Sequence, residues 1–544
     1  MAMKRLRHMT ALLTILAMLA AACGDGGSSS DGTAATTTTT APSGDDPAPD
    51  PTTEDPAGEA GGTLIVALAT EPNSIFLPNS AERNAINVST QIYEGPVWIN
   101  DDNEVEPALA TEWEVNDDAT VFTFTLREGV AFHNGETMDA EDWIASWEAA
   151  SQDANVYAYL YQKVTSVVAL DEMSVEMTLA SSDALFGREL SEWAILPASQ
   201  WEAEGLDGIE ANPIGTGPFK FVSWDRGDRI TLEAHEDYWN EGLPLVDGIV
   251  FRPIPDSSTR LAAVQTGEVH IAQRFNAEEA ATLENAPGVN VVTYPVDRVY
   301  YIAFNNLTTG IGTPLESREV RLAMNHAVDR QAIVDSLFDG QAALSTGLVS
   351  TSSLGFDGSL APFEYDPELA MQLLADAGYP DGFTIGFACP TGAYVNFEEV
   401  CQAVGGYLEA VGITLDGGEI QFMESGQYWD LEASKQLPPL FGDSWSSTSS
   451  ESLERLQGAL GGFDADYSAW TDDTILGFLS EIQTTIDEDA RAAVYTELQR
   501  YTYEDPPFIY LYEPFAFEGI NEAVQNYKPR AAEDYFLKEV SLAG

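Results

Sequence analysis

The residue types that could support catalysis are scattered along this chain of 544 residues. Five histidines stand at positions 8, 133, 235, 270 and 326, without the His-Glu-x-x-His spacing of a zinc hydrolase. No Gly-x-Ser-x-Gly nucleophile motif occurs, and the glycine-rich run 215–218 lacks the lysine of a phosphate-binding loop, so we expect a tight turn there. Carboxylate pairs are common, but 88 acidic residues bring many together by chance. The sequence therefore predicts no catalytic residue, no metal site and no cofactor, and a cell-surface hydrolase stays the alternative class.

Two cysteines, Cys389 and Cys401, are close enough in sequence to close a short loop. In an exported protein such a pair most simply forms a disulfide, which would stabilise this fold by about 2–3 kcal/mol. A metal site is a poor alternative, because two thiolates without nearby histidine do not complete a tetrahedron. We therefore predict a Cys389–Cys401 disulfide.

The N-terminus predicts export. A basic stretch with Lys4, Arg5 and Arg7 precedes an apolar run over residues 11–22, which is too short to cross a bilayer, and three alanines lead to Cys23. Residues 1–22 therefore have the architecture of a secretory signal peptide. The junction also resembles a bacterial lipobox, although Leu19 lies one position before the usual leucine site. We expect Cys23 to be lipidated and the protein to be anchored to the outer face of the cell membrane or periplasmic; the alternative is ordinary cleavage with an unmodified cysteine.

The stretch after Cys23 is poor in large apolar side chains up to residue 61 and rich in Gly, Ser, Thr, Pro and Asp. Such a segment cannot offset the entropy of ordering, so we expect residues 23–61 to form a lipidated cysteine followed by a disordered tether. No later stretch approaches the eighteen apolar residues expected of a transmembrane helix.

The charge balance is strongly acidic. Lys and Arg total 24 against 88 Asp and Glu, which gives a formal net charge of −64. Nucleic-acid binding needs clustered basic residues that neutralise phosphates. We therefore do not expect a protein of this composition to bind nucleic acid. The acidic surplus fits a solubilising surface, and adaptation to high salt is the alternative explanation.

Hydrophobic periodicity predicts a mixed α/β protein. The apolar run 63–68 indicates a buried strand, and the alternation over 122–126 indicates a half-buried strand. Asp139 and Asp142 are spaced as the capping box of a helix that starts at residue 140. Three further helices are expected from apolar stripes at 320–327, with Gly340 ending that segment, at 367–377, and at 494–501.

Ordered blocks of sequence resemble family 5 of the extracellular solute-binding proteins, the group that includes oligopeptide, dipeptide and nickel receptors of ABC importers. The blocks run from about residue 62 to 515 in the family's order. They include the runs Tyr93-Glu94-Gly95, 107–113, 122–135, 212–219, 251–261, 320–330 and 505–512.

The resemblance implies a periplasmic-binding-protein fold of the large three-part class, type II-like, with two lobes around a ligand cleft. It implies a discontinuous lobe I formed by residues 62–90, 212–295 and 507–544. It also implies an inserted small domain II over residues 91–211 and a lobe III over residues 296–506. Closure of such lobes around a ligand would be of the hinge or shear type.

The segment 441–450 holds the ligand residues that the resemblance implies. In peptide-binding relatives the matching loop has a tryptophan followed three residues later by an aspartate that pairs with the ligand's α-ammonium. Here Trp445 matches, Thr448 occupies the aspartate position, and Asp443 lies two residues before the tryptophan. We therefore expect Trp445, Asp443, Ser446 and Thr448 to bind ligand. Asp443 would replace the missing acid, or the ligand has no free ammonium; a solvated Ser/Thr loop is the alternative.

The expected function is an extracytoplasmic receptor, without chemistry of its own, that captures an oligopeptide-like solute and delivers it to ABC permease and ATPase subunits. Non-peptide ligands, such as an oligosaccharide or a metal chelate, are the alternatives within the same fold. A sensor built on the same fold is a further alternative.

Overall fold

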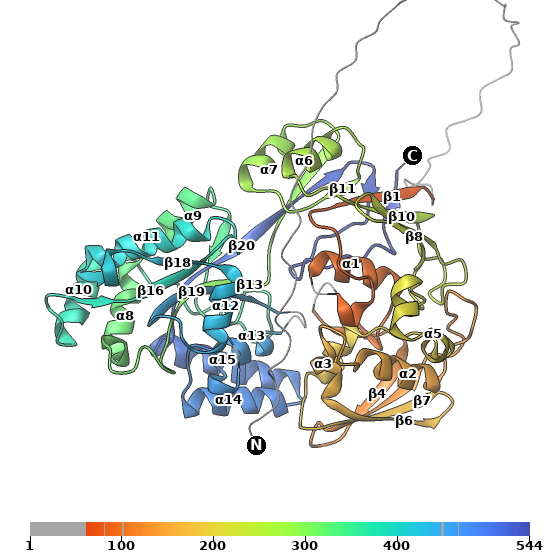
Figure 1. The fold of residues 1–544 in the computed structure, drawn as a ribbon, viewed down its shortest axis with the longest axis horizontal. Helices are drawn as coiled ribbons and strands as arrows, with labels where there is room; N and C mark the ends of the chain where they lie inside the picture. Colours follow the sequence, from red (N-terminus) through yellow and green to blue (C-terminus); the bar gives the residue numbers. More distant parts are fainter. Residues whose placement is uncertain (1–60, 81, 101–102, 448–450, 466, 544) are drawn as a thin grey trace, which may run out of the picture. The chain divides into compact units, whose positions relative to one another are not determined.

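The computed structural model describes residues 61–80, 82–100, 103–447, 451–465 and 467–543, and these all belong to the compact unit 57–544. One large mixed sheet dominates this part of the chain (Figure 1). Its strand order is β18 (Gln421–Glu424), β16 (Phe387–Thr391), β19 (Leu440–Ser446), β13 (Arg298–Phe304), β20 (Phe508–Asn521), β11 (Ile271–Ala272), β1 (Thr63–Leu68), β10 (Gly248–Pro253), β9 (Arg229–Ala234) and β8 (Phe219–Asp225), with β12 (Val289–Pro295) and β14 (Ala342–Leu344) also paired to β20.

The long strand β20 joins the two halves of this sheet. Its N-terminal part pairs antiparallel with β13 and β14, whereas its C-terminal part pairs with β11 and β12. Most residues in the N-terminal part of β20 are apolar and fully buried. They belong to the hydrophobic core of the second half of the chain, which holds the strand in place. A single continuous strand therefore links the two halves of the protein (Figure 1).

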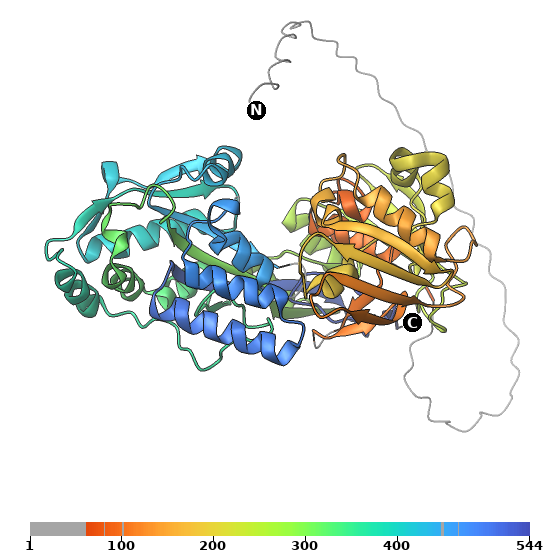
Figure 2. The same ribbon diagram turned by 90° about the horizontal axis from the view of Figure 1, so that it is seen from below.

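The insertion between the first strands of the large sheet has a sheet of its own (Figure 2). The antiparallel order is β4 (Ala110–Val115), β5 (Val121–Leu126), β7 (Ser174–Leu179) and β6 (Val164–Asp171). Phe122 and Phe124 point into a separate core under helix α2 (Ala140–Ala150), as the alternation of β5 requires. Three two-stranded sheets complete the list: β2 (Val97–Ile99) with β3 (Val105–Pro107), β15 (Phe383–Ile385) with β17 (Ile413–Leu415), and β21 (Val524–Gln525) with β22 (Ser541–Leu542).

Helices pack their apolar faces against the sheets. Besides α2, they are α1 (Arg83–Ile92), α3 (Ala158–Gln162), α4 (Phe186–Glu189), α5 (Ala198–Ala211), α6 (Ser257–Gln265), α7 (Ala277–Glu284), α8 (Arg318–Ala327), α9 (Arg330–Leu337), α10 (Pro367–Asp376), α11 (Phe397–Ala410), α12 (Ser425–Ala433), α13 (Leu453–Leu460), α14 (Asp473–Thr484) and α15 (Glu488–Glu504). Among the described residues, none of these helices is both long and apolar enough to cross a bilayer.

The elements agree with their sequence patterns, with one difference. The strands over 63–68 and 122–126 are β1 and β5, and both halves of the Asp139–Asp142 capping box are formed at α2. The segment from 320 to Gly340 contains two helices, because α8 ends at Ala327 and α9 starts anew with Asp329 as its cap. The positive φ of Gly340 then follows the end of α9.

Of the domain boundaries expected from the resemblance, two coincide with the ends of helices or strands, one lies inside a helix, and one concerns a strand that both halves share. The junction at 211/212 is the end of α5, and that at 295/296 is the end of β12. The junction at 90/91 lies inside α1, which continues to Ile92 because Tyr93 N–H still bonds to Ser89 C=O at 2.8 Å. The junction at 506/507 assigns β20 to lobe I, although this strand pairs with strands of both halves.

Candidate functional site

A cavity of about 610 Å³ lies between the inserted region and the second half of the chain. One wall comes from residues 157–193 and includes Tyr157, Tyr159 and Trp193. The opposite wall comes from the end of β19, from α13 and from the loop before α14, and includes Trp445 and Tyr467. The volume and the aromatic walls suit a small solute that is bound between two parts of the protein.

Strand β19 carries Trp445 and Ser446 into this cavity. The strand is held in antiparallel register by β13, with Val299 opposite Trp445 and Arg298 opposite Ser446. The indole ring of Trp445 packs on helix α13 at Gly458, where a Cβ atom would approach the ring to 2.5 Å. The absence of a side chain at Gly458 therefore leaves the room that the indole ring of Trp445 occupies beside α13.

Ser446 is oriented from behind the cavity by Arg298. The Arg298 guanidinium donates to Ser444 Oγ at 2.9 Å and to Ser446 Oγ at 3.2 Å. It also lies 5.8 Å from the ring centre of Tyr394, within the range of a cation–π contact. The two serine hydroxyls, which alternate with Asp443 and Trp445 along β19, are thus fixed by a single cation on the adjacent strand.

Asp443 is buried beneath the cavity rather than among its lining residues. Its side chain is only 3% exposed, and its carboxylate accepts hydrogen bonds from Tyr301 Oη at 3.2 Å and Tyr394 Oη at 3.1 Å. The buried carboxyl of Glu432 on α12 is a further neighbour. Burial raises the pKa of Asp443 to about 6, and burial together with the charge of Asp443 raises that of Glu432 well above its ordinary value. Burial thus makes the charged form of either carboxyl costly.

The four predicted ligand residues thus have different positions. Trp445 and Ser446 line the cavity, Asp443 lies below it, and Thr448 lies outside the described residues. A direct contact between Asp443 and a ligand stays a prediction, because the ligand would first have to displace the two tyrosine hydroxyls. Cys23, the expected lipidation site, also lies outside the described residues.

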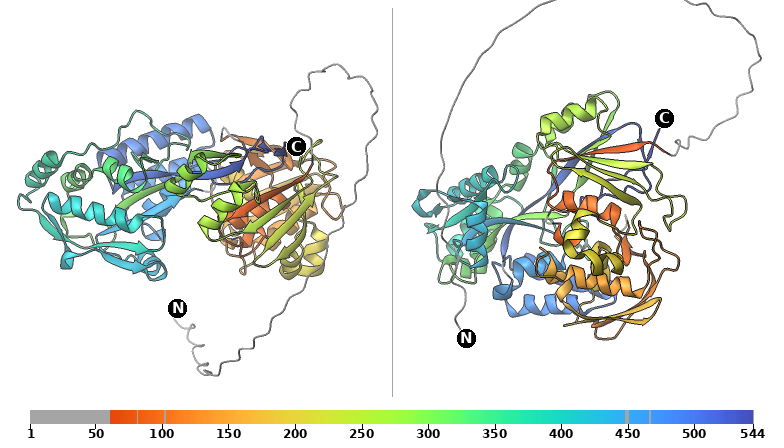
Figure 3. Two further views of the ribbon diagram at one scale, coloured as in Figure 1. Left: turned by 90° about the horizontal axis from the view of Figure 1, so that it is seen from above. Right: turned by 45° about the vertical axis from the view of Figure 1, so that its right-hand side comes forward.

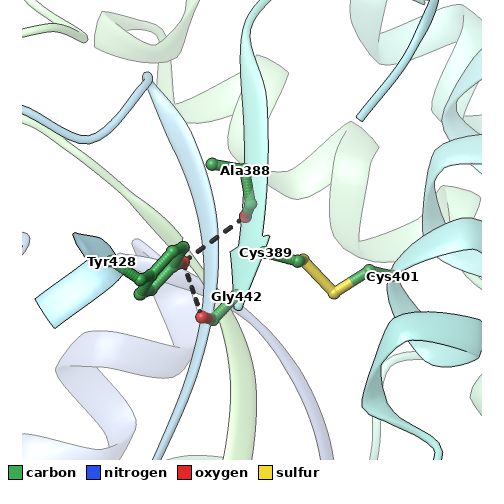
Figure 4. The surroundings of a disulfide bond; sticks show 5 residues. All are labelled: Ala388, Cys389, Cys401, Tyr428 and Gly442. Carbon is green, nitrogen blue, oxygen red and sulfur yellow. Dashed lines mark hydrogen bonds between the residues drawn. A yellow bond between two sulfur atoms is a disulfide. The ribbon is translucent and has the colours of Figure 1, made fainter. Parts of the chain in front are cut away.

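A disulfide supports β19 from the other side. Cys389 on β16 and Cys401 on α11 are bonded and fully buried (Figure 4). Gly442 lies against both sulfur atoms, and a Cβ atom there would approach the Sγ of Cys389 to 2.8 Å. Tyr428 donates to the carbonyl of Gly442 at 2.8 Å. The disulfide and Tyr428 therefore fix the backbone immediately before Asp443.

The inserted region contacts the second half of the chain at helix α14, and the right-hand view of Figure 3 shows these two parts side by side. Ala184 N–H donates to Gln483 C=O at 2.7 Å, and Leu185 is buried in the core of the second half. Arg188 reaches Glu451, which is itself fully buried and accepts two hydrogen bonds from Arg491. Backbone, apolar and ionic contacts therefore all join the two walls at this point.

The glycine-rich run and the histidines, which were considered as candidates for phosphate or metal binding, contact other parts of the protein instead. Gly215 and Gly217 lie against the carbonyl of Ile92, where a Cβ atom would come within 2.1 and 2.6 Å, so the run forms a tight junction with α1. His133 and His235 are in edge-to-face contact at 4.9 Å, and burial lowers the pKa of His133 to about 3. Within the described residues, no group of three His, Cys, Asp or Glu side chains is arranged to hold a metal ion.

Sequence reasoning missed the wall formed by the inserted region. Tyrosines at 157, 159 and 161 alternate just before β6, and all three line the cavity. This alternation was a signal in the sequence, but it did not indicate that the segment would face β19, which is far away along the chain.

Comparisons with known proteins agree with this architecture. The model of the bacterial extracellular solute-binding proteins, family 5, middle region, matches residues 104–466. The glutathione-binding protein GsiB of Salmonella paratyphi A is 33% identical over 325 residues, which cover 59% of this chain and 62% of that protein. The protein of the same name from Shigella dysenteriae is 28% identical over 459 residues, which cover 82% of this chain and 88% of that protein.

Solved structures show the same fold. The structure of HbpA2 from Haemophilus parasuis matches with a TM-score of 0.81 and 25% identity, over 88% of this chain and all of that one. The periplasmic binding protein DppA from Helicobacter pylori, in complex with the peptide STSA, matches with a TM-score of 0.72 and 25% identity, over 89% and 99% of the two chains. The expected periplasmic-binding-protein fold is thereby confirmed. The chain belongs to family 5 of the bacterial extracellular solute-binding proteins.

Proposed function

We propose that this protein is the extracytoplasmic receptor of an ABC importer and that it captures a peptide-like solute in the cavity between the inserted region and the second half. The observation that carries the proposal is the cavity itself, which places aromatic side chains on two facing walls with Trp445 and Ser446 at the end of β19. Relatives named as glutathione-binding and a similar structure with a bound peptide support a peptide-like ligand. We propose no chemical step for the protein.

In this proposal the indole of Trp445 packs on the solute, and the hydroxyl of Ser446 bonds to its backbone. The Trp445 Nε1 atom is buried and has no protein acceptor among the described residues, so a carbonyl group of the solute could accept from it. The ring is held by α13 and the serine by Arg298, so both groups are in place before the solute arrives. Such preorganisation reduces the entropy lost on binding.

The proposal is tested by screening purified protein for thermal stabilisation and then by calorimetry. Di-, tri- and tetrapeptides are compared with oligosaccharides and with a nickel–histidine chelate at the same concentrations. We expect one or more peptides to raise the melting temperature and to bind with a measurable heat. Stabilisation by a sugar or by the chelate, with none by any peptide, would contradict a peptide-like ligand.

We further propose that the protein is exported and is tethered to the membrane through a lipid on Cys23. The basic, apolar and small-residue segments that precede this cysteine support the proposal. The test is membrane fractionation of the full chain and of a Cys23→Ser variant. Release of the variant from the membrane fraction is expected, and equal fractionation of the two would contradict lipid anchoring.

A further inference from the structure

The two walls of the cavity bring carboxylates toward each other. Glu454 on α13 lines one wall, whereas Glu189 and Glu192 of the inserted region line the other. Burial is the main cause of the raised pKa of Glu189 and of Glu192, and the negative charge of Glu454 contributes to both shifts. The three acids therefore line the same cavity from two walls, and their negative charges add within it.

The residues that line the cavity include little positive charge to offset these carboxylates. Lys163 is the one cation among the lining side chains of the described chain, and it is already engaged with Asp183 at 2.8 Å and with Glu189. Arg83 pairs with Glu192 at 3.1 Å from outside the lining. The lining thus contains four carboxylates and one ammonium group, and Lys163 and Arg83 together pair with three of the four carboxylates.

Aromatic rings stand on both walls beside these acids. Tyr157 and Tyr159 are in edge-to-face contact at 6.2 Å on the inserted wall, and Trp445 and Tyr467 at 5.9 Å on the facing wall. The faces of such rings attract ammonium and guanidinium groups, most strongly where water is excluded. Independently of the carboxylates, the aromatic walls therefore also suit a cationic group.

Resting on the proposed function, we propose that the cavity selects peptides of net positive charge. The cationic side chain of the peptide lies between Glu454 on one wall and Glu189 and Glu192 on the other. A cation at this place relieves the repulsion between the walls, whereas an additional carboxylate increases it. Glutathione has more carboxylate than ammonium groups, so it is a poor ligand here, in contrast to the relatives that are named for it.

The test is calorimetry with a matched series of peptides at about 0.15 M salt, where charges more than about 8 Å apart are largely screened. The series is Ala-Lys-Ala, Ala-Gln-Ala and Ala-Glu-Ala, with glutathione as a fourth ligand. We expect the lysine peptide to bind about tenfold more tightly than the glutamine peptide, and the other two to bind more weakly still. Equal affinities, or a preference for glutathione, would overturn this inference and leave the proposed function standing. Absence of binding by all four would overturn both.

A variant pair separates the cavity from the general acidity of the chain. Glu454→Gln removes one wall carboxylate and is expected to reduce the preference for lysine over glutamine by about threefold or more. Glu409→Gln on α11 changes the net charge equally at an exposed position and is expected to leave the preference unchanged. Equal reductions in the two variants would show that long-range charge, and not the cavity, sets the preference, which would also overturn the inference.

Discussion

Arg188 of the inserted region lies with its Nε atom 3.6 Å from Oε1 of Glu451 in the second half of the chain. Both side chains are buried, and Glu451 also accepts hydrogen bonds from Arg491 and from Tyr495. The inserted region is thus tied to the wall that carries Trp445 by a charge network whose central carboxylate, Glu451, is fully buried. Since burial weakens screening, this contact matters more than the exposed ion pairs of the chain.

Replacing Arg188 should destabilise the protein. Arg188→Met keeps much of the stem but removes the cation and its bonds to Asn103, while Glu451 retains Arg491. We expect the free energy of unfolding in urea to fall by about 1–3 kcal/mol. Arg229→Met is the control, because its pair with Asp228 is about half exposed, and it should change stability by less than about 0.5 kcal/mol. An unchanged Arg188→Met variant would show that the network adds nothing.

Gly442 should not tolerate a side chain. In Gly442→Ala the new methyl group would meet Cys389, Cys401 and Phe397, all buried, and we expect a loss of about 1–3 kcal/mol through overpacking. Gly406→Ala on α11 is the matched control, because no atom lies within 4 Å of the added methyl group. That variant should be stabilised by about 0.5–1 kcal/mol through helix propensity. Chemical denaturation of both variants makes the comparison, and a stable Gly442→Ala protein would contradict the packing described.

Glu518 should make stability depend on pH. Burial, with a smaller contribution from the negative charge of Glu533, raises its pKa from 4.5 to about 7, although the hydrogen bonds that Tyr527 and Tyr294 donate lower it. The folded state therefore holds this proton more tightly than the unfolded state does. The contribution is complete below about pH 4.5 and is lost as the pH rises through 7, with a total of about 3 kcal/mol.

The measurement is the free energy of unfolding at about pH 5 and pH 7.5 for the wild type and for Glu518→Gln. The variant should lose less stability on going to the higher pH than the wild type does. Glu497→Gln, an exposed substitution on α15, should retain the full dependence of the wild type. Identical pH dependence of all three proteins would exclude Glu518 as the titrating group.

Asp443 and Trp445 should affect ligand affinity differently. Trp445 lines the cavity, so Trp445→Ala should weaken binding of the best peptide by about tenfold or more. Asp443 is enclosed by Tyr301, Tyr394 and Glu432, so Asp443→Asn should weaken it by less than about threefold. Calorimetry measures the peptide affinity of both variants, and thermal melting shows whether each variant is folded. A large loss for Asp443→Asn would instead support direct contact with the ligand's ammonium group.

The sequence alone determined the class of the protein and much of its local structure. Strands such as β1 and β5, and the capping box of α2, follow from apolar periodicity and from side chains that bond to nearby backbone, both of which act over a few residues. Family membership followed from ordered blocks of residues. Trp445 and Ser446 could be selected for the site because they lie in one such block.

Only the tertiary structure decided which residues face them. Strand pairing and domain docking are long-range events, and the pattern of Tyr157, Tyr159 and Tyr161 does not show that they lie opposite β19. The same limit applies to Asp443, because its burial depends on Tyr301 and Glu432, which come from other elements. The charge of the cavity was likewise hidden among 88 acids until the fold brought Glu454 to face Glu189 and Glu192.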